Sequence, residues 1–296
     1  MKLPEMIDLH MHTTASDGTD TPAEILDHVR EQGLELFAVT DHDGIAGVEE
    51  IRKIREEDPE KSKGLLFLNG IEFSCRDDEG KYHILGYGYD ENAKVMIDTV
   101  SIAHENRLKK VEERLKFLKE DFGFTFAEED IRALYRNHNP GKPHIANLMI
   151  KYGYAQSIEQ AMKEFLNKKK FPNVYIRPDV AIQTILESDG IPVLAHPSYG
   201  DGDQLIVGDE MDQRLSRLVG FGLRGVEAYY SGFTPKLCSQ MLQFADQYDL
   251  FVTAGSDYHG KNKLIEIGET TLDSVSEGSE KLHAFLEYVI ESGKAY

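Results

Sequence analysis

The sequence has no tryptophan and only two cysteines, Cys75 and Cys238. Two cysteines cannot form the disulfide framework of a small secreted domain, so we expect free thiols in a reducing cytoplasm. No apolar run approaches the roughly 20 residues of a membrane span. The N-terminus also lacks a basic segment followed by an apolar stretch, so we expect no signal peptide. These absences predict a cytoplasmic protein without a membrane partner.

Basic residues are few, with 33 lysines and arginines against 52 aspartates and glutamates and a formal net charge of −19. Such a charge argues against long nucleic acid as a partner, because that binding needs basic groups to displace counterions. A short nucleotide held by metal ions is not excluded, since each divalent ion would add about +2 locally. The 296 residues, 41% of them hydrophobic, suffice for one large α/β domain or a domain with an insertion.

Strand patterns and helix patterns alternate at both ends of the chain. The expected strands lie at residues 7–10, 36–40, 65–73, 82–89, 192–195, 225–229 and 251–254. This alternation predicts a parallel sheet or barrel. The middle of the chain reads mostly as helix, with an apolar stripe from Leu108 to Leu118 and charged residues on the opposite, solvated face. We therefore expect an α/β body formed by residues 1–91 and 178–296, interrupted by a helical insertion at 92–177.

Side chains that bind metals follow one expected strand after another. His10 and His12 are two residues apart at the end of the first strand, so they point to the same side. Further candidate ligands in the following loop and at later strand ends are Asp17, His42, Glu72, His83, His196, Asp257 and His259. In barrels of parallel strands, the carboxyl-end face carries the active site. Imidazole and carboxylate donors favour manganese, iron or zinc over calcium or magnesium.

These donors are too many for one ion, so we predict two or three divalent transition-metal ions. Closely spaced ions need a bridging carboxylate, and Glu72 is the natural candidate. Ions about 3.5–4 Å apart are typical of phosphoester hydrolysis, in which they bind the nucleophile and the leaving oxygen. The pattern therefore indicates a metal-dependent phosphoesterase.

The motifs, in this order, resemble those of the PHP (polymerase and histidinol phosphatase) family. The residues that carry the resemblance are His10-Met11-His12-Thr13, Ser16-Asp17-Gly18, Thr40-Asp41-His42-Asp43, Gly70-Ile71-Glu72, His83, Ala195-His196-Pro197 and Gly255-Ser256-Asp257-Tyr258-His259. Residues 92–177 resemble the helical insertion of the nucleotide-phosphatase branch. The resemblance implies the PHP fold, a distorted (βα)7 TIM-like barrel, with an inserted helical subdomain and a trinuclear metal site.

The resemblance also implies a ligand set for each metal. The first metal would be held by His10, His12, Glu72 and Asp257. Glu72 would bridge to a second metal held by His83 and His196. The third would be held by Asp17, His42 and His259. The expected catalytic residues are Glu72, Asp17 and His196, whereas Asp41 and Asp43 are expected to orient His42 and its loop.

Substrate contacts are expected mainly from the insertion. The branch commonly has Gly-Arg-Pro-His where this chain has Gly141-Lys142-Pro143-His144, so a lysine replaces the arginine expected to bind phosphate. Lys142 and His144 precede an apolar helix, whose start favours anions. Arg177 could contact phosphate or pin the insertion to the barrel. Glu227 lies within reach of the site, with a structural role as the alternative.

Three functions remain as hypotheses. The leading one is hydrolysis of a phosphomonoester of a nucleotide (a 5′-mononucleotide or a 3′,5′-bisphosphate) or of a short oligonucleotide, by attack of a metal-bridging hydroxide. The second is histidinol-phosphate phosphatase or another small-metabolite phosphatase. The third is a non-catalytic PHP module that binds metal or nucleotide, which the complete ligand set disfavours. The exact substrate, the general acid and the oligomeric state stay open.

Overall fold

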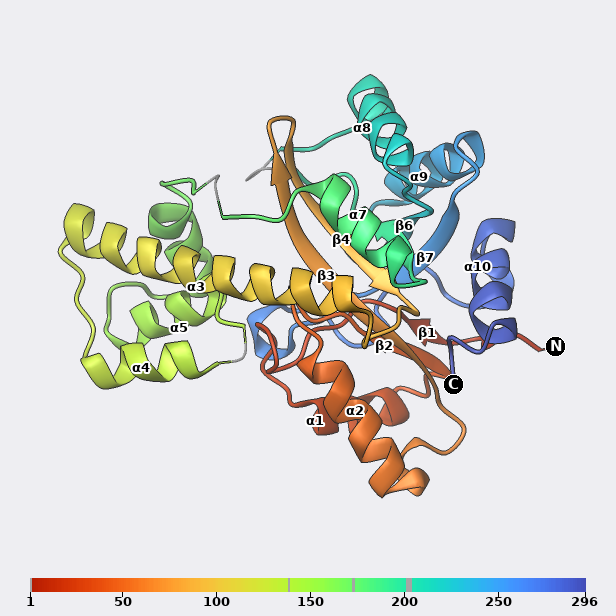
Figure 1. Ribbon diagram of the computed structural model, residues 1–296, viewed down its shortest axis with the longest axis horizontal. Helices are drawn as coiled ribbons and strands as arrows, with labels where there is room; N and C mark the ends of the chain where they lie inside the picture. The colour runs from red at the N-terminus through yellow and green to blue at the C-terminus, as the bar shows by residue number, and fades with distance from the viewer. Residues whose placement is uncertain (1, 138, 172–173, 201–203) are drawn as a thin grey trace.

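The computed structural model describes residues 2–137, 139–171, 174–200 and 204–296. Its centre is a seven-stranded sheet in which the strands neighbour one another in chain order. The strands are β1 (Ile7–Asp8), β2 (Leu36–Val39), β3 (Leu66–Asp77), β4 (Gly80–Tyr87), β5 (Ile191–Leu194), β6 (Gly225–Tyr230) and β7 (Phe251–Gly255). The Leu9 amide donates to the Ala254 carbonyl, so β1 returns to β7 and the sheet nearly closes (Figure 1). This confirms the predicted distorted barrel.

β4 runs antiparallel to both of its neighbours, whereas the other strand pairs of the sheet are parallel. Only two residues separate β3 from β4, and such a short connection permits only an antiparallel pair. Ser74 therefore pairs with His83, and Glu72 pairs with Leu85. The expected alternation of strand and helix fails here, and Glu72 and His83 lie within paired strands rather than at strand ends.

Within the described ranges, six helices cover the barrel. They are α1 (Pro22–Glu31), α2 (Ala46–Glu57), α7 (Pro178–Glu187), α8 (Gly208–Gly220), α9 (Pro235–Gln247) and α10 (Glu280–Glu291), with short 3₁₀ segments at Pro59–Ser62, Gly260–Asn262 and Val275–Glu277. α1 starts at a capping box, in which the Glu24 amide donates to Thr21 Oγ1 and the Thr21 amide donates to Glu24 Oε2. Its apolar stripe then buries Ile25, Leu26 and Val29 against the sheet.

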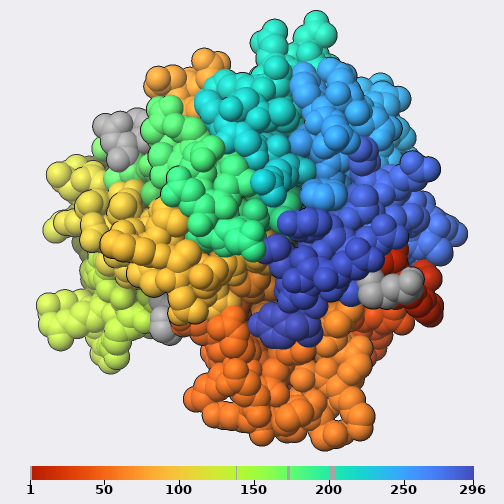
Figure 2. Space-filling model, turned by 45° about the vertical axis from the view of Figure 1, so that its right-hand side comes forward, coloured from red at the N-terminus to blue at the C-terminus, as the bar shows by residue number. Residues whose placement is uncertain are grey.

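The middle of the chain forms α3 (Lys94–Phe122), α4 (Glu128–Arg136), α5 (Lys142–Lys151), α6 (Ile158–Gln160) and a π-helical turn at Ala161–Leu166. α3 spans two cores, because Met96 packs in the barrel core and Val111 in a separate core with α4 and α5. Figure 1 shows α3 extending away from the barrel toward α4 and α5. Figure 2 shows its first half beside α7, where Thr99 Oγ1 lies 2.9 Å from Thr184 Oγ1. The boundaries at residues 92 and 177 stay a prediction.

Both cysteine thiols are buried and unpaired. Burial raises the pKa of the Cys75 thiol and of the Cys238 thiol, which makes both poor nucleophiles. None of the helices in the described ranges is long and apolar enough to cross a membrane.

Candidate metal centre

The two histidines of the first motif lie together just after β1. Their ring centroids are 5.2 Å apart, and both side chains are fully buried. Asp8 stabilises this strand end, because Oδ1 accepts hydrogen bonds from the His10 and Ser256 amides and Oδ2 accepts one from the Gly268 amide. Asp8 was not predicted as a site residue, although a carboxylate within an apolar strand is a usable signal.

Glu72 lies at the centre of the cluster. Three imidazole nitrogens surround its Oε2: His42 Nδ1 at 3.0 Å, His12 Nε2 at 3.2 Å and His10 Nε2 at 3.4 Å. Two others face its Oε1: His83 Nδ1 at 2.8 Å and His196 Nε2 at 3.1 Å. The two carboxylate oxygens thus face different sets of imidazoles, as expected for a carboxylate that bridges two ions.

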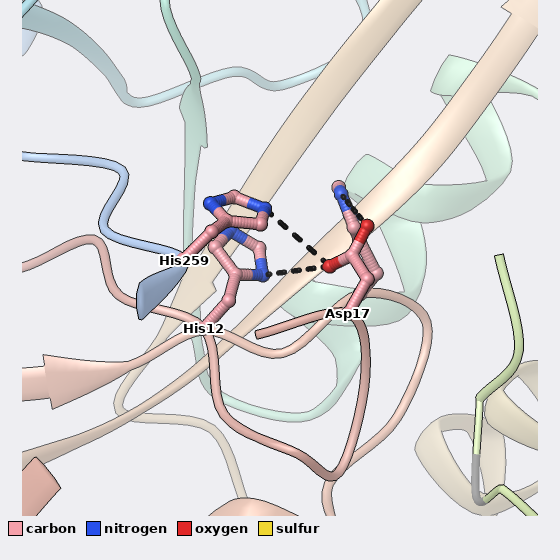
Figure 3. A group of neighbouring side chains, drawn as sticks. His12, Asp17 and His259 are labelled. Atoms are coloured by element: carbon pink, nitrogen blue, oxygen red, sulfur yellow. Dashed lines mark ion pairs between the residues drawn. The ribbon is translucent and has the colours of Figure 1, made fainter. Parts of the chain in front are cut away.

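Asp17, in the loop after β1, faces a second part of the cluster. Its Oδ1 lies 3.4 Å from His259 Nε2 and 3.8 Å from His12 Nδ1 (Figure 3). His259 Nδ1 lies 2.8 Å from the Asp257 carbonyl oxygen. A hydrogen bond at one ring nitrogen orients the imidazole and presents the other nitrogen to a ligand.

Three sets of side chains bring their donor atoms within 4.8 Å of one another. The sets are His12, Asp17, His42 and His259; His10, His12 and Asp257; and His42, Glu72 and His83. The first two include most of the ligands that the family resemblance groups together. The third contains His42 where the resemblance implies His196, although His196 contacts the same Glu72 carboxylate. All the predicted ligands lie in one cluster, and their assignment to particular ions stays a prediction.

Four buried atoms of the cluster have no hydrogen-bond partner among the described residues. They are His10 Nε2, His12 Nε2, His42 Nδ1 and Glu72 Oε2. A buried polar atom without a partner costs about 1–3 kcal/mol, so native proteins normally satisfy such atoms. Imidazole nitrogens and a carboxylate oxygen that converge without hydrogen bonds are suitable donors for transition-metal ions. The donor set therefore fits the implied metals.

The buried charges change one another's pKa values. Burial raises the pKa of Glu72, but the imidazoles of His42 and His83 outweigh it and hold that pKa well below its usual range. Burial lowers the pKa of His12, but the adjacent carboxylates of Asp257 and Glu72 outweigh it and raise the pKa to about 9. Burial, followed by repulsion from His12, lowers the pKa of His259 to about 4. Protons and metal ions therefore compete for His12.

Glu227 lies behind the cluster, on β6. Its Oε1 is 2.9 Å from His10 Nδ1, and its Oε2 accepts a hydrogen bond of 2.7 Å from the His196 amide. The side chain is fully buried and does not line the cavity in front of the cluster. Its contacts orient two predicted ligands, so the geometry favours the structural alternative over a substrate contact.

A cavity of about 440 Å³ opens onto the cluster. The predicted ligands in its wall are Asp17, His42, Glu72, His83, His196, Asp257 and His259. The turn before α5 lines the cavity through Pro140 and Gly141, and the first residues of α5 line it through Lys142 and Pro143. Asn139 Nδ2 donates a hydrogen bond of 2.5 Å to the His42 carbonyl and ties this turn to the cluster. This turn thus lies beside the metal cluster.

The remaining predicted substrate residues lie in different places. Lys142 lines the cavity. His144 Nδ1 accepts a hydrogen bond of 3.1 Å from the Gly141 amide, so its ring caps the start of α5. Arg177 is exposed and pairs with Asp179 at 3.0 Å, at the start of α7 and outside the cavity wall. The structure therefore brings Lys142 to the cavity but not Arg177.

Three basic side chains of α3 were not predicted as site residues, because the charged face of this segment was expected to be solvated. Arg107, Lys110 and Arg114 are 6%, 7% and 5% exposed and line the cavity. Arg107 Nε donates a hydrogen bond of 2.6 Å to Asp43 Oδ2, and its Nη2 donates one of 3.2 Å to Ser74 Oγ. The available signal was the spacing of three and four residues, which places all three on one helix face.

Other polar contacts support the cluster from outside. Asp41 accepts hydrogen bonds from the Thr13 amide and the Ser16 hydroxyl, which orients the loop that carries Asp17. Tyr230 and Lys263 also line the cavity, and both contact Asp257 Oδ2. Lys263 was not predicted, because a single residue in a loop carries no spacing signal.

The PHP domain family matches residues 8–220 of this chain. The chain belongs to the PHP domain family. This PHP protein is 30% identical over 265 residues to phosphoribosyl 1,2-cyclic phosphate 1,2-diphosphodiesterase of Eggerthella lenta, covering 86% of this chain and 94% of the relative. It is 28% identical over 278 residues to a 5′-3′ exoribonuclease of Haemophilus influenzae, and the match covers 90% of this chain and 96% of the relative.

A crystal structure from Bifidobacterium adolescentis, assigned as a metal-dependent phosphoesterase, superposes with a TM-score of 0.79 and 27% identity. It covers 96% of this PHP protein and 97% of the other chain. Family, relatives and fold agree with the ligand cluster. The chain is a metal-dependent phosphoric ester hydrolase.

Proposed function

We propose that this PHP protein hydrolyses a phosphomonoester of a nucleotide, whether a 5′-mononucleotide, a 3′,5′-bisphosphate or the end of a short oligonucleotide. The observation that carries the proposal is that Lys142 and the start of α5 line the same cavity as the metal cluster. The free N–H groups of a helix start and a lysine attract phosphate. A cavity of about 440 Å³ suits a small ligand.

We also propose two or three manganese, iron or zinc ions, held by the nine predicted ligands. When bound, such ions activate water as a nucleophile and neutralise charge on the phosphoryl group. Lys142, at the start of α5, would balance charge on the phosphate oxygens. Glu227 would keep His10 oriented through its 2.9 Å contact.

Two tyrosines favour a nucleotide over a smaller metabolite. Tyr199 and Tyr230 line the cavity with ring centroids 5.8 Å apart. Tyr199 is 39% exposed, so part of its ring faces solvent. Nucleobases stack on exposed aromatic rings. The names of the two relatives, a phosphoribosyl cyclic phosphate diesterase and an exoribonuclease, support a ribose phosphate as the substrate class.

Phosphate release from a substrate panel tests this proposal. The panel comprises nucleoside 5′-monophosphates, adenosine 3′,5′-bisphosphate, short 5′-phosphorylated RNA, histidinol phosphate and sugar phosphates, each with the manganese-loaded enzyme. We expect a nucleotide or oligonucleotide to have the highest kcat/KM. A preference for histidinol phosphate or a sugar phosphate would contradict the proposal. Absence of release from every compound would support a non-catalytic module.

A further inference from the structure

A second cavity of about 260 Å³ adjoins the metal cavity. The two cavities share Lys81, Arg114, Lys142 and Tyr175 in their walls. Lys169 also lines the second cavity, and we call these five residues the basic pocket. Its basic side chains contrast with the net charge of −19 of the whole chain. Positive charge is therefore concentrated beside the metal cavity.

Arg114 is the most informative member of the basic pocket. It is only 5% exposed, and its Nε has no hydrogen-bond partner among the described residues. Its guanidinium carbon lies 5.5 Å from the centre of the Phe171 ring. A buried charged donor without a partner is unfavourable unless a ligand supplies the acceptor. Arg114 thus has an unused donor within a cavity wall.

The three cations on this face of α3 have few carboxylate partners. Arg107 forms an ion pair with Asp43 at 2.6 Å. Lys110 lies 4.1 Å from the centre of the Tyr175 ring, and neither Lys110 nor Arg114 forms an ion pair with a carboxylate in the described ranges. One carboxylate therefore faces three buried cations. An anion that enters here would gain charge-assisted hydrogen bonds.

We propose that the basic pocket binds a second phosphate group of the substrate while the first lies at the metal cluster. The inference rests on the proposed function, since it assumes that a phosphoester occupies the metal cavity. Lys142 lines both cavities and would lie between the two phosphates. Either a nucleoside bisphosphate or a short oligonucleotide supplies two phosphates, so both should be preferred over a mononucleotide.

The test compares three substrates in wild-type enzyme and in variants of the pocket. The substrates are 5′-AMP, adenosine 3′,5′-bisphosphate and the 5′-phosphorylated dinucleotide pApA. Arg114→Met keeps most of the side-chain volume but removes the charge, and Lys169→Ala removes the charge of an exposed residue. Each variant should lower kcat/KM for a two-phosphate substrate, relative to 5′-AMP, by about tenfold to a hundredfold.

Each outcome decides the inference. If relative kcat/KM falls only for the bisphosphate, a nucleoside bisphosphate is the source of the second phosphate. If it falls only for pApA, the source is an oligonucleotide. Lys116→Met, on the exposed face of the same helix, should leave both ratios unchanged. Unchanged ratios in Arg114→Met and Lys169→Ala would overturn the inference, while hydrolysis of all three substrates would leave the proposed function standing.

A binding measurement separates failure of the inference from failure of the proposed function. If no substrate is hydrolysed, the proposed function is wrong. Calorimetry of adenosine 3′,5′-bisphosphate and 5′-AMP with the same metal-loaded proteins then shows whether the basic pocket binds the second phosphate. If the two variants bind the bisphosphate about tenfold or more weakly than wild type does, the inference is supported. Equal affinities in wild type and variants would overturn it.

Discussion

Asn139 occupies the space that a side chain at Gly44 would need. A Cβ atom at Gly44 would lie 2.5 Å from Asn139 Nδ2, the atom that donates to the His42 carbonyl. The missing side chain thus makes room for a hydrogen bond that ties the turn before α5 to a predicted ligand.

Gly44→Ala should therefore displace Asn139 and weaken the connection between that turn and the cluster. We expect kcat/KM to fall about tenfold and the free energy of unfolding to fall by about 1–3 kcal/mol, the usual effect of overpacking. Steady-state kinetics and denaturant unfolding measure the two effects. Gly220→Ala is the matched control, because a Cβ there meets nothing within 4 Å.

A double variant identifies the cause of the Gly44→Ala defect. If displacement of Asn139 is responsible, Gly44→Ala should have much less effect in an Asn139→Ala background, because contacting residues are not additive. An equal loss of kcat/KM in both backgrounds would show that Asn139 is not involved.

Metal content should depend on His10. Two or three ions per chain are expected by elemental analysis after manganese reconstitution, and a chelator should remove them together with activity. His10→Ala should lose metal and activity together, because its Nε2 lies among the converging donors. His283→Ala should keep both, since its Nε2 instead lies 2.7 Å from the Val275 carbonyl. At most one ion per wild-type chain would refute the multinuclear assignment.

Glu72→Gln should be the most damaging conservative substitution in the cluster. Both carboxylate oxygens face imidazoles, so loss of the charge would weaken two metal positions at once. Phosphate release should fall by several orders of magnitude, while circular dichroism shows an intact fold. Glu79→Gln, in the exposed hairpin turn, is the control. Near-normal turnover of Glu72→Gln would rule out the bridging role.

Lys142→Ala should weaken substrate binding and turnover without changing metal content. Loss of one charge-assisted contact is worth about 1.5–3 kcal/mol, or roughly tenfold to a hundredfold in kcat/KM. Lys142→Arg should retain or improve activity, since arginine can bind phosphate at two points. Lys163→Ala, an exposed lysine nearby in sequence, should match wild type. Wild-type kinetics in Lys142→Ala would remove Lys142 from the site.

Lys110 should make stability depend on pH. Burial lowers the pKa of Lys110 from 10.5 to about 7, with only partial compensation from Asp43. Between these two pH values the unfolded chain binds more protons than the folded chain, so the free energy of unfolding rises with pH. The destabilisation from burying this charge is complete below about pH 7 and disappears toward pH 10.5.

Lys110→Met should therefore stabilise the protein by about 1–3 kcal/mol at pH 6 and by much less at pH 10. Denaturant unfolding at both pH values measures the difference. Lys116→Met, which changes an exposed lysine on the same helix, should show no such pH dependence. An equal gain at both pH values would assign the effect of Lys110→Met to packing rather than to charge.

The sequence alone was sufficient to predict the barrel and to single out the clustered side chains. His10 and His12 share a side because strand geometry alternates with a period of two, whatever the strand pairs with. Asp257 and His259 follow a strand in the same way. Since strand ends converge on one face of a barrel, residues far apart in the chain could be expected to meet there.

Only the tertiary structure decided which charged side chains face that centre. Helical periodicity places Arg107, Lys110 and Arg114 on one face of α3, but it does not say whether solvent or a cavity covers that face. The two-residue connection after β3 likewise reverses β4 and brings His83 back beside Glu72. Local periodicity determines how a side chain points from its own helix or strand, whereas long-range packing determines what it meets.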